Sequence, residues 1–161
     1  MSKSSKGFSL IELLIVVAII LIIAAIAIPN LLRSRIAANQ ASAVGSLRTL
    51  NTSEITYSST FNVGFTYTLA YLVSPSPSTA NPTSTAAGLI DSVLASGAKS
   101  GYTFTYTPGV SDSTGRINAY TIAAQPITNS TGTNYYFTDQ SGVIRQNSTT
   151  TASATDSPIG G

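Results

Sequence analysis

The most prominent pattern in the chain is a long apolar block near its N-terminus. Apolar residues run without interruption from Leu13 to Ile28, and Phe8 and the pair Leu31-Leu32 extend the block at its two ends. As an α-helix, residues 8–32 would be roughly 37 Å long, whereas the hydrocarbon core of a bilayer is about 30 Å thick. The block therefore predicts a helix long enough to cross a membrane.

A different periodicity follows Pro29. Apolar and a few polar residues recur at alternating spacings of three and four, which is the pattern of one face of an amphipathic helix. The positions on this face are Ile36, Gln40, Ala43, Leu47, Leu50, Glu54, Tyr57 and Phe61. Since no loop-rich gap separates the two patterns, we favour one helix over residues 8–60, broken or kinked at Pro29, which lacks a backbone N–H. A membrane helix followed by a separate surface helix is the alternative.

The next part of the chain reads as a loop followed by a short helix. Residues 74–85 are rich in Ser, Thr and Pro, which is typical of a loop. Residues 86–96 carry apolar side chains at helical spacing, and Gly97 follows them as a helix stop. We therefore predict a short helix over residues 86–96.

The C-terminal third predicts a small antiparallel sheet. Residues 102–106 alternate with period two, residues 117–124 offer a second strand, and residues 134–138 and 143–146 flank a hairpin signal that ends in Gly142. A sheet of three or four strands cannot stand alone, so we expect one face of it to pack on the helix stripe of Leu47, Leu50 and Tyr57. The predicted fold class is α+β, with a polar tail over residues 148–161 that we expect to be disordered.

Composition removes most familiar chemistry. The chain has 161 residues and a mass of 16.6 kDa, contains neither Cys nor His, and is only 9% charged, while Ser and Thr together make up 46 residues. Disulfides, thiolate nucleophiles, histidine bases and the commonest metal ligands are therefore excluded. The net charge of +2 is spread along the chain, so no nucleic-acid site is predicted, and we predict neither a catalytic residue nor a metal or other cofactor.

Glu12 is the anomalous residue of the apolar block. An ionised carboxylate costs roughly 2.5–3.5 kcal/mol at the centre of a bilayer and less near the end of a helix. In one interpretation the side chain reaches the lipid headgroups and has no further role. In the other it has a cationic partner, and the free backbone N–H groups at the start of its own helix already favour an anion there.

Three interpretations of the N-terminal segment compete. Ala25-Ile26-Ala27 resembles the small-x-small site at which secretory signal peptides are cut. A simple uncleaved membrane anchor explains the length of the block but not Glu12. The third comes from the residues themselves: Lys6-Gly7-Phe8-Ser9-Leu10-Ile11-Glu12-Leu13-Leu14, followed by the apolar run and Pro29-Asn30, closely resembles the start of type IV prepilins.

The resemblance implies a specific processing and assembly route. Residues 1–7 would be a leader that a prepilin peptidase removes after Gly7, and Phe8 would become the N-methylated mature N-terminus. Glu12 would pair with the N-terminal amine of a neighbouring subunit, and Pro29 would shape the helix during assembly. Many relatives have glycine where this sequence has Leu21, so unwinding of the helix there should be harder.

The same resemblance implies partners and a location. The subunit would wait in the inner membrane, associate with a pilus assembly platform and then enter an extracellular filament made of many copies of itself. Residues 61–161 would form a Ser/Thr-rich head on the outside, as in the pilin fold. Loss of the leader removes Lys3 and Lys6, which leaves six basic and six acidic side chains. The mature chain would be about neutral, without strong self-repulsion against close packing.

Alternatives remain open for the whole chain. Within the resemblance the alternative is a pseudopilin of a type II secretion or DNA-uptake machine, but the Pro29-Asn30-Leu31-Leu32 continuation and the Ser/Thr-rich head favour a pilus. From other classes, a monomeric membrane-anchored binding domain is an alternative, and a secreted enzyme fits poorly without Cys and His. Minor candidate features are given simpler interpretations: Asp139 and Ser141 as a turn rather than a metal site, Lys99 and Ser100 as neighbours rather than a catalytic dyad. An aromatic run lies at Tyr135-Tyr136-Phe137. Three triplets match the glycosylation pattern: Asn51-Thr52-Ser53, Asn129-Ser130-Thr131 and Asn147-Ser148-Thr149.

Overall fold

The computed structural model describes residues 7–75 and 81–160. The chain divides into two compact units, residues 1–35 and residues 36–161, and each is described by itself. The leader up to residue 6 and residues 76–80 of the expected loop lie outside the described residues.

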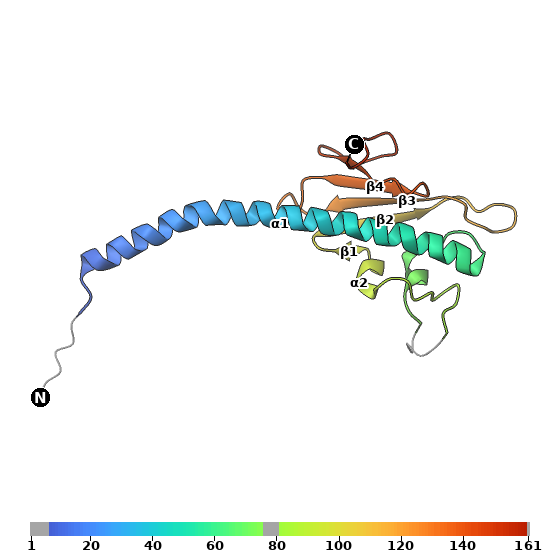
Figure 1. Ribbon diagram of the computed structural model, residues 1–161, viewed down its shortest axis with the longest axis horizontal. Coiled ribbons are helices and arrows are strands. Elements are labelled where there is room, and N and C mark those ends of the chain that lie inside the picture. The colour runs from blue at the N-terminus through green and yellow to red at the C-terminus, as the bar shows by residue number, and fades with distance from the viewer. Residues whose placement is uncertain (1–6, 76–80, 161) are drawn as a thin grey trace, which may run out of the picture. The chain divides into compact units, whose positions relative to one another are not determined.

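Helix α1 spans Leu10–Phe61 and is 52 residues long (Figure 1). It is assigned without interruption across Pro29, so the expectation of one long helix is confirmed, and both the alternative of two separate helices and a break at Pro29 are wrong for this structure. Proline removes a single backbone donor, and hydroxyl and amide side chains add hydrogen bonds around it. Asn30 Nδ2 donates to the Ile26 carbonyl at 3.0 Å, and Ser34 Oγ donates to the Asn30 carbonyl at 3.0 Å.

The second unit contains one antiparallel sheet in which the strands follow chain order. Its strands are β1 (Ala98–Lys99), β2 (Tyr102–Pro108), β3 (Tyr120–Pro126), β4 (Tyr135–Asp139) and β5 (Arg145–Asn147). Register pairs Phe104 with Ala124 and Ala123 with Phe137. The α+β class is confirmed, and the two-residue strand β1 brings the predicted three or four strands to five.

One face of the sheet packs on the C-terminal part of α1, within the second unit (Figure 1). Leu47 and Leu50 are completely buried there and Tyr57 is 3% exposed, so the predicted stripe is confirmed. The sheet supplies alternate, inward-facing side chains, as the period of two requires. The buried residues of the sheet are Tyr102, Phe104, Tyr120, Ile122, Ala124, Tyr136 and Thr138.

The helix predicted over residues 86–96 is much shorter than expected. Helix α2 spans only Ser92–Ala95. The preceding residues run alongside the short 3₁₀ helix η1 (Leu69–Leu72), because the backbone N–H groups of Leu89 and Ile90 both donate to the Leu72 carbonyl. Leu89 and Ile90 therefore have helical spacing in the sequence but lie outside the helix, where their N–H groups bond to Leu72.

The expectation of a disordered C-terminal tail is wrong for residues 148–160. This segment returns along β5, where the Ile159 N–H donates to the Ile144 carbonyl at 2.9 Å and the Gln146 N–H donates to the Ser157 carbonyl at 3.0 Å. Ala152 is buried, and the Asp156 carboxylate organises the turn. Its Oδ2 accepts from the Ser153 N–H at 2.7 Å, and its Oδ1 accepts from Asn147 Nδ2 at 2.8 Å. Specific polar contacts hold a segment whose composition alone indicated disorder.

Candidate processing and assembly site

The first turn of α1 is organised by Ser9 and Glu12. The Ser9 N–H donates to Glu12 Oε2 at 2.9 Å, and the Leu13 N–H donates to the Ser9 carbonyl at 3.2 Å. Ser-x-x-Glu is the sequence of a capping box, in which the glutamate three residues into the helix accepts from the N–H of the capping residue. The sequence motif therefore has a local structural role as well as any role in assembly.

This geometry narrows the interpretation of Glu12. The carboxylate lies in the first helical turn, where the helix dipole favours a negative charge. Only Oε2 accepts a hydrogen bond from the described residues, and the side chain is exposed, so Oε1 is open to a donor from outside the chain. The helix start thus supplies part of the compensation that an acidic residue in this position requires.

The peptide bond between Gly7 and Phe8 is accessible. Gly7 precedes the helix and is exposed, and a Cβ placed on it would meet no atom within 4 Å. Phe8 is 79% exposed. Phe8 and Ser9, which lie outside regular structure, separate the bond from the start of α1 at Leu10.

The apolar part of α1 presents large side chains on every side of the helix. A window in this helix has a mean hydropathy of 3.3, and none of it is buried within the described chain, so the helix is long and apolar enough to cross a membrane. Phe8, Leu10 and Leu31 are each more than 70% exposed. A helix that is apolar all round needs an apolar surrounding, either lipid or other helices.

The N-terminal segment is similar to segments of known proteins. Residues 2–28 match a family model described as a prokaryotic N-terminal methylation motif. Over 37 residues the chain is 65% identical to the type IV wide pilus major component PilA4 of Thermus thermophilus. The N-terminal segment is therefore similar to that of a type IV pilin. The matched stretch is 23% of this chain and 28% of that protein, so the chain spans less than a third of the length of the relative it matches. No solved structure matches the chain.

The match agrees with the pilin interpretation of the N-terminus. It covers Gly7, Phe8 and Glu12, and it extends through Ala25-Ile26-Ala27, so the matched motif favours a prepilin leader over a signal peptide cut at the small residues. The matched region ends at residue 28, one residue before Pro29. The family model therefore gives no information on the second unit, residues 36–161.

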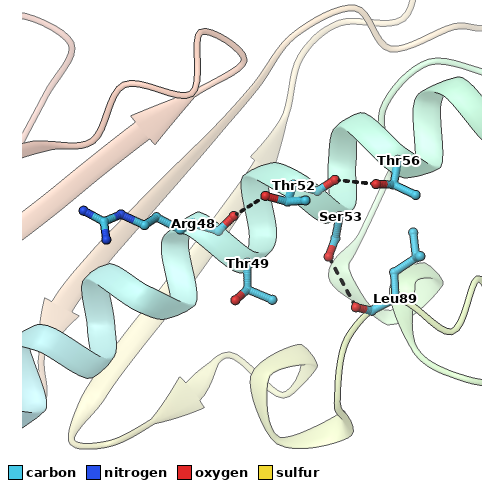
Figure 2. A pocket seen from close by; sticks show the side chains of 6 residues that line it. All are labelled: Arg48, Thr49, Thr52, Ser53, Thr56 and Leu89. Carbon is cyan, nitrogen blue, oxygen red and sulfur yellow. Dashed lines mark hydrogen bonds between the residues drawn. The ribbon is translucent and has the colours of Figure 1, made fainter.

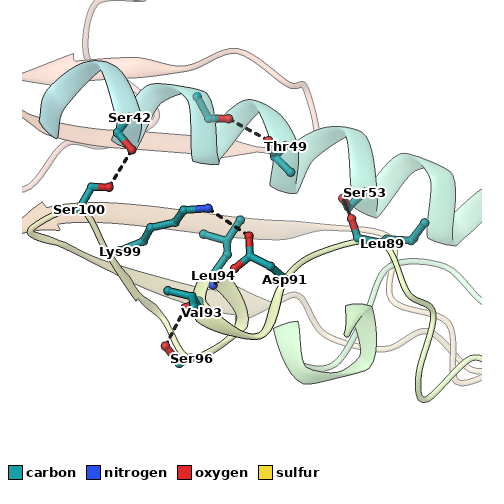
Figure 3. Close-up of polar contacts among 11 residues, drawn as sticks. Ser42, Thr49, Ser53, Leu89, Asp91, Val93, Leu94, Ser96, Lys99 and Ser100 are labelled. Carbon is teal, nitrogen blue, oxygen red and sulfur yellow. Dashed lines mark hydrogen bonds and ion pairs between the residues drawn. The ribbon is translucent and has the colours of Figure 1, made fainter. Parts of the chain in front are cut away.

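The remaining candidate residues of the head serve the local structure. Lys99 Nζ lies 3.0 Å from Asp91 Oδ2, whereas the Ser100 hydroxyl accepts from Ser42 Oγ at 2.9 Å, so these neighbours face different partners (Figure 3). Asp139 Oδ1 accepts from the Ser141 N–H at 2.9 Å, as in a tight turn. Among the described residues no group of three acidic, Cys or His side chains is gathered that could hold a metal.

The aromatic run and the glycosylation-like triplets also have structural positions. Tyr136 is buried against Tyr102, with ring centroids 5.9 Å apart, while its two neighbours are half-buried on the other face of β4. Asn51 is buried in the core, and Asn147 Oδ1 accepts from the Thr149 and Thr150 N–H groups. Asn129 is exposed, which makes it the accessible member of the three.

A shallow groove of about 410 Å³ runs beside the C-terminal half of α1 (Figure 2). Its hydroxyl groups are directed to carbonyls of the chain: Thr52 Oγ1 donates to Arg48, Thr56 Oγ1 donates to Thr52, and Ser53 Oγ donates to Leu89. The lining carries one cation and no carboxylate, so it offers no acid–base pair. The complete lining is Arg48, Thr49, Thr52, Ser53, Thr56 and Leu89.

Two polar residues of α1 that are buried in the core of the second unit were not predicted from the sequence. Asn51 and Glu54 are 6% and 0% exposed, and each links α1 to other elements through side-chain hydrogen bonds. The spacing of Glu54 gives one indication of its burial, because Glu54 lies on the same stripe as Leu47, Leu50 and Tyr57. That spacing alone predicts no role for Glu54.

Proposed function

We propose that the chain is a structural subunit of a type IV pilus-like extracellular filament and not an enzyme. A prepilin peptidase would cut it after Gly7 and Phe8 would be N-methylated. Residues 8–32 would hold the subunit in the inner membrane as a single-pass helix until a pilus assembly platform adds it to the filament. The observation that carries the proposal is a pilin-type segment whose large apolar side chains are all exposed, with a glutamate at the start of its helix.

The energetics of assembly support a specific role for Glu12. Transfer from lipid into a bundle of helices exchanges one apolar surrounding for another, so apolar burial alone gives little bias. An ion pair between Glu12 and the freed amine of Phe8 on a neighbour would provide direction and register. Glu12 Oε1 has no hydrogen-bond partner among the described residues, which leaves one carboxylate oxygen for that amine.

The geometry of such a pair favours a polymer. A contact between the N-terminus of one copy and Glu12 of the next uses two different surfaces, and a repeated contact of this kind forms an open helical array unless it closes into a ring. The mature chain carries six basic and six acidic side chains, so repeated close packing meets little net repulsion. The Ser/Thr-rich head would cover the filament.

Electron microscopy of material sheared from cells tests the proposal. Long fibres that contain this chain are expected from cells expressing the native sequence, and cells expressing Gly7→Val should yield none. Short fibres that form only on overexpression would assign the chain to a pseudopilus of a secretion or DNA-uptake machine. Absence of fibres, with the chain recovered as a monomer in membranes, would contradict the proposal and favour a membrane-anchored binding domain.

A further inference from the structure

Glu54 is a fully buried acidic residue that has no cationic partner within residues 7–75 and 81–160. It lies on α1 in the second unit and is 0% exposed. The ion pair found among the described residues joins Lys99 to Asp91, so it does not involve Glu54. The titratable groups that face Glu54 are tyrosines from three elements: Tyr57 on α1, Tyr106 on β2 and Tyr120 on β3. A buried carboxylate in such surroundings is costly unless it is neutralised.

Glu54, Thr66 and Tyr106 form a closed set of hydrogen-bonding contacts. The Thr66 N–H donates to Glu54 Oε2 at 3.0 Å, and Thr66 Oγ1 lies 2.5 Å from Glu54 Oε1. Thr66 Oγ1 is also 3.3 Å from Tyr106 Oη, and Tyr106 Oη donates to the Thr66 carbonyl at 2.7 Å. The set joins α1, the segment after α1, and β2.

Counting hydrogens shows which protonation state fits this arrangement. A hydroxyl carries one hydrogen, and Tyr106 directs its own to the Thr66 carbonyl. If Glu54 were ionised, the Thr66 hydroxyl would donate to it, and no separate hydrogen would remain for the Thr66–Tyr106 contact. If Glu54 is protonated, Oε1 donates to Thr66 Oγ1, which then donates to Tyr106. In the second case each contact has a hydrogen of its own, whereas in the first case Tyr106 would have to share its hydrogen between the Thr66 carbonyl and Thr66 Oγ1.

We propose that Glu54 is a neutral carboxylic acid in the folded subunit and that its proton closes a pH-sensitive clasp between the end of α1 and the sheet. Burial raises the pKa of Glu54 above its usual value, and the hydrogen bonds from Thr66 and Tyr106 oppose that effect only in part. The clasp holds the chain where it leaves α1, and it opens when the proton is lost.

The direction of the pH dependence follows from the raised pKa. The unfolded chain gives up this proton at the usual glutamate pKa, whereas the folded chain keeps it to higher pH. The contribution of Glu54 to stability is therefore complete below the usual pKa and is lost as the pH rises through the raised value. The fall in stability is therefore expected on the alkaline side of the usual glutamate pKa.

Carbon-13 NMR of the full mature chain in detergent micelles reports the protonation state directly. The chain contains two glutamates, Glu12 and Glu54, so labelling the glutamate carboxyl carbon gives two signals. Glu12→Gln removes one signal and thereby assigns the other to Glu54. We expect the Glu54 signal to have the shift of a protonated acid at pH 7 and to titrate above it. A Glu54 signal with the shift of a carboxylate at pH 7 would overturn the proposal.

Thermal unfolding of variants tests the clasp itself. Glu54→Gln keeps the shape, a donor for Thr66 Oγ1 and an acceptor for the Thr66 N–H, so its melting temperature should match the native value at acid pH and should not fall as the pH rises to about 9. The isosteric control Asp139→Asn, at a half-buried turn residue, should keep the native pH dependence. A Gln variant that melts well below the native chain at neutral pH would show that the carboxylate is required, which contradicts the proposal.

Substitution at the other two members separates the clasp from general packing. Thr66→Val preserves shape but removes the shared hydroxyl, and Tyr106→Phe removes the terminal one; both should lower the melting temperature, and Thr66→Ser should restore it. Tyr67→Phe is the matched control, because the Tyr67 hydroxyl is bonded to the Gly115 carbonyl at the surface. If the melting temperature of Thr66→Val and Tyr106→Phe falls at alkaline pH just as that of the native chain does, the clasp is contradicted.

Discussion

Asn51 Oδ1 accepts a hydrogen bond from the Tyr120 hydroxyl at 3.0 Å, and both side chains are buried. The amide nitrogen of Asn51 donates in the other direction, to Thr138 Oγ1 at 2.8 Å. A single side chain on α1 therefore joins β3 and β4. Because a buried polar group requires a partner, this arrangement fixes the rotation of the helix over the sheet more tightly than apolar packing can.

Asn51→Ala should destabilise the head by about 2–4 kcal/mol, because it leaves the Tyr120 and Thr138 hydroxyls buried without this partner. Urea unfolding of the mature chain in micelles measures the change in the free energy of unfolding. Asn129→Ala, at an exposed loop position, is the control and should change that free energy by less than about 0.5 kcal/mol. Equal stability of the two variants would show that the Asn51 network contributes nothing.

Acid should weaken the turns that aspartates organise. Hydrogen bonds from Ser153 and Asn147 hold the pKa of Asp156 below its usual value, and hydrogen bonds from Thr114 and Asn118 do the same for Asp112. A lowered pKa means that stabilisation is present above the usual value of about 4 and is lost as the pH falls through the lowered one.

The C-terminal segment offers the sharpest readout of that acid effect. The Ile159 N–H donates to the Ile144 carbonyl, and its protection against hydrogen exchange, measured relative to the intrinsic rate at each pH, should fall on acidification. Asp156→Ala should lower this protection at neutral pH as well, since the Ser153 N–H and Asn147 lose their acceptor. Unchanged protection of Ile159 in that variant would contradict the assigned role of Asp156.

Gly7→Val should leave the leader attached. A Cβ at residue 7 meets no atom within 4 Å, so the substitution does not disturb the described structure and acts through recognition by the peptidase. Immunoblots of membranes should show only the longer precursor. Gly45→Val is the control, because Gly45 is also exposed with open space for a Cβ, and it should be processed normally. Recovery of a mature chain that begins at Phe8 from Gly7→Val would contradict the predicted cut.

Glu12→Gln should separate the two roles of this side chain. Glutamine can replace glutamate in a capping box, so the first turn of α1 is expected to remain intact, whereas the negative charge is lost. We expect normal processing and membrane insertion but a large loss of sheared fibres. Glu12→Ala, which loses both the cap and the charge, should be no better. A native fibre yield from Glu12→Gln would contradict pairing between Glu12 and an amine.

The sequence predicted those elements whose residues carry a period. The apolar block and the stripe of Leu47, Leu50 and Tyr57 predicted α1, and the alternation over residues 102–106 predicted β2. Gly142, at φ +74, occupies the left-handed position that the hairpin signal required. The candidate residues Gly7, Phe8 and Glu12 lie close together in the sequence, so their spacing could be recognised without a structure.

The elements that were mispredicted depend on partners that are distant in sequence. Leu89 and Ile90 have helical spacing, but their N–H groups bond Leu72, and no local pattern reveals that choice. The composition of the tail predicts disorder because the tail has few apolar residues. Its order comes instead from the hydrogen bonds that the Asp156 carboxylate accepts. Glu54 lay on the predicted stripe, yet only the structure brings Thr66 and Tyr106 to it.

The mass of the N-terminal peptide of the chain isolated from native membranes or fibres tests the central claim most directly. If the chain is a processed pilin-type subunit, the peptide begins at Phe8 and is heavier than the unmodified sequence by the mass of one CH₂, because a methyl group replaces a hydrogen on the amine. A mature chain that begins at Ile28, after the small residues Ala25-Ile26-Ala27, would identify an ordinary secretory signal peptide and would contradict the account. An intact peptide that begins at Met1 would contradict it equally.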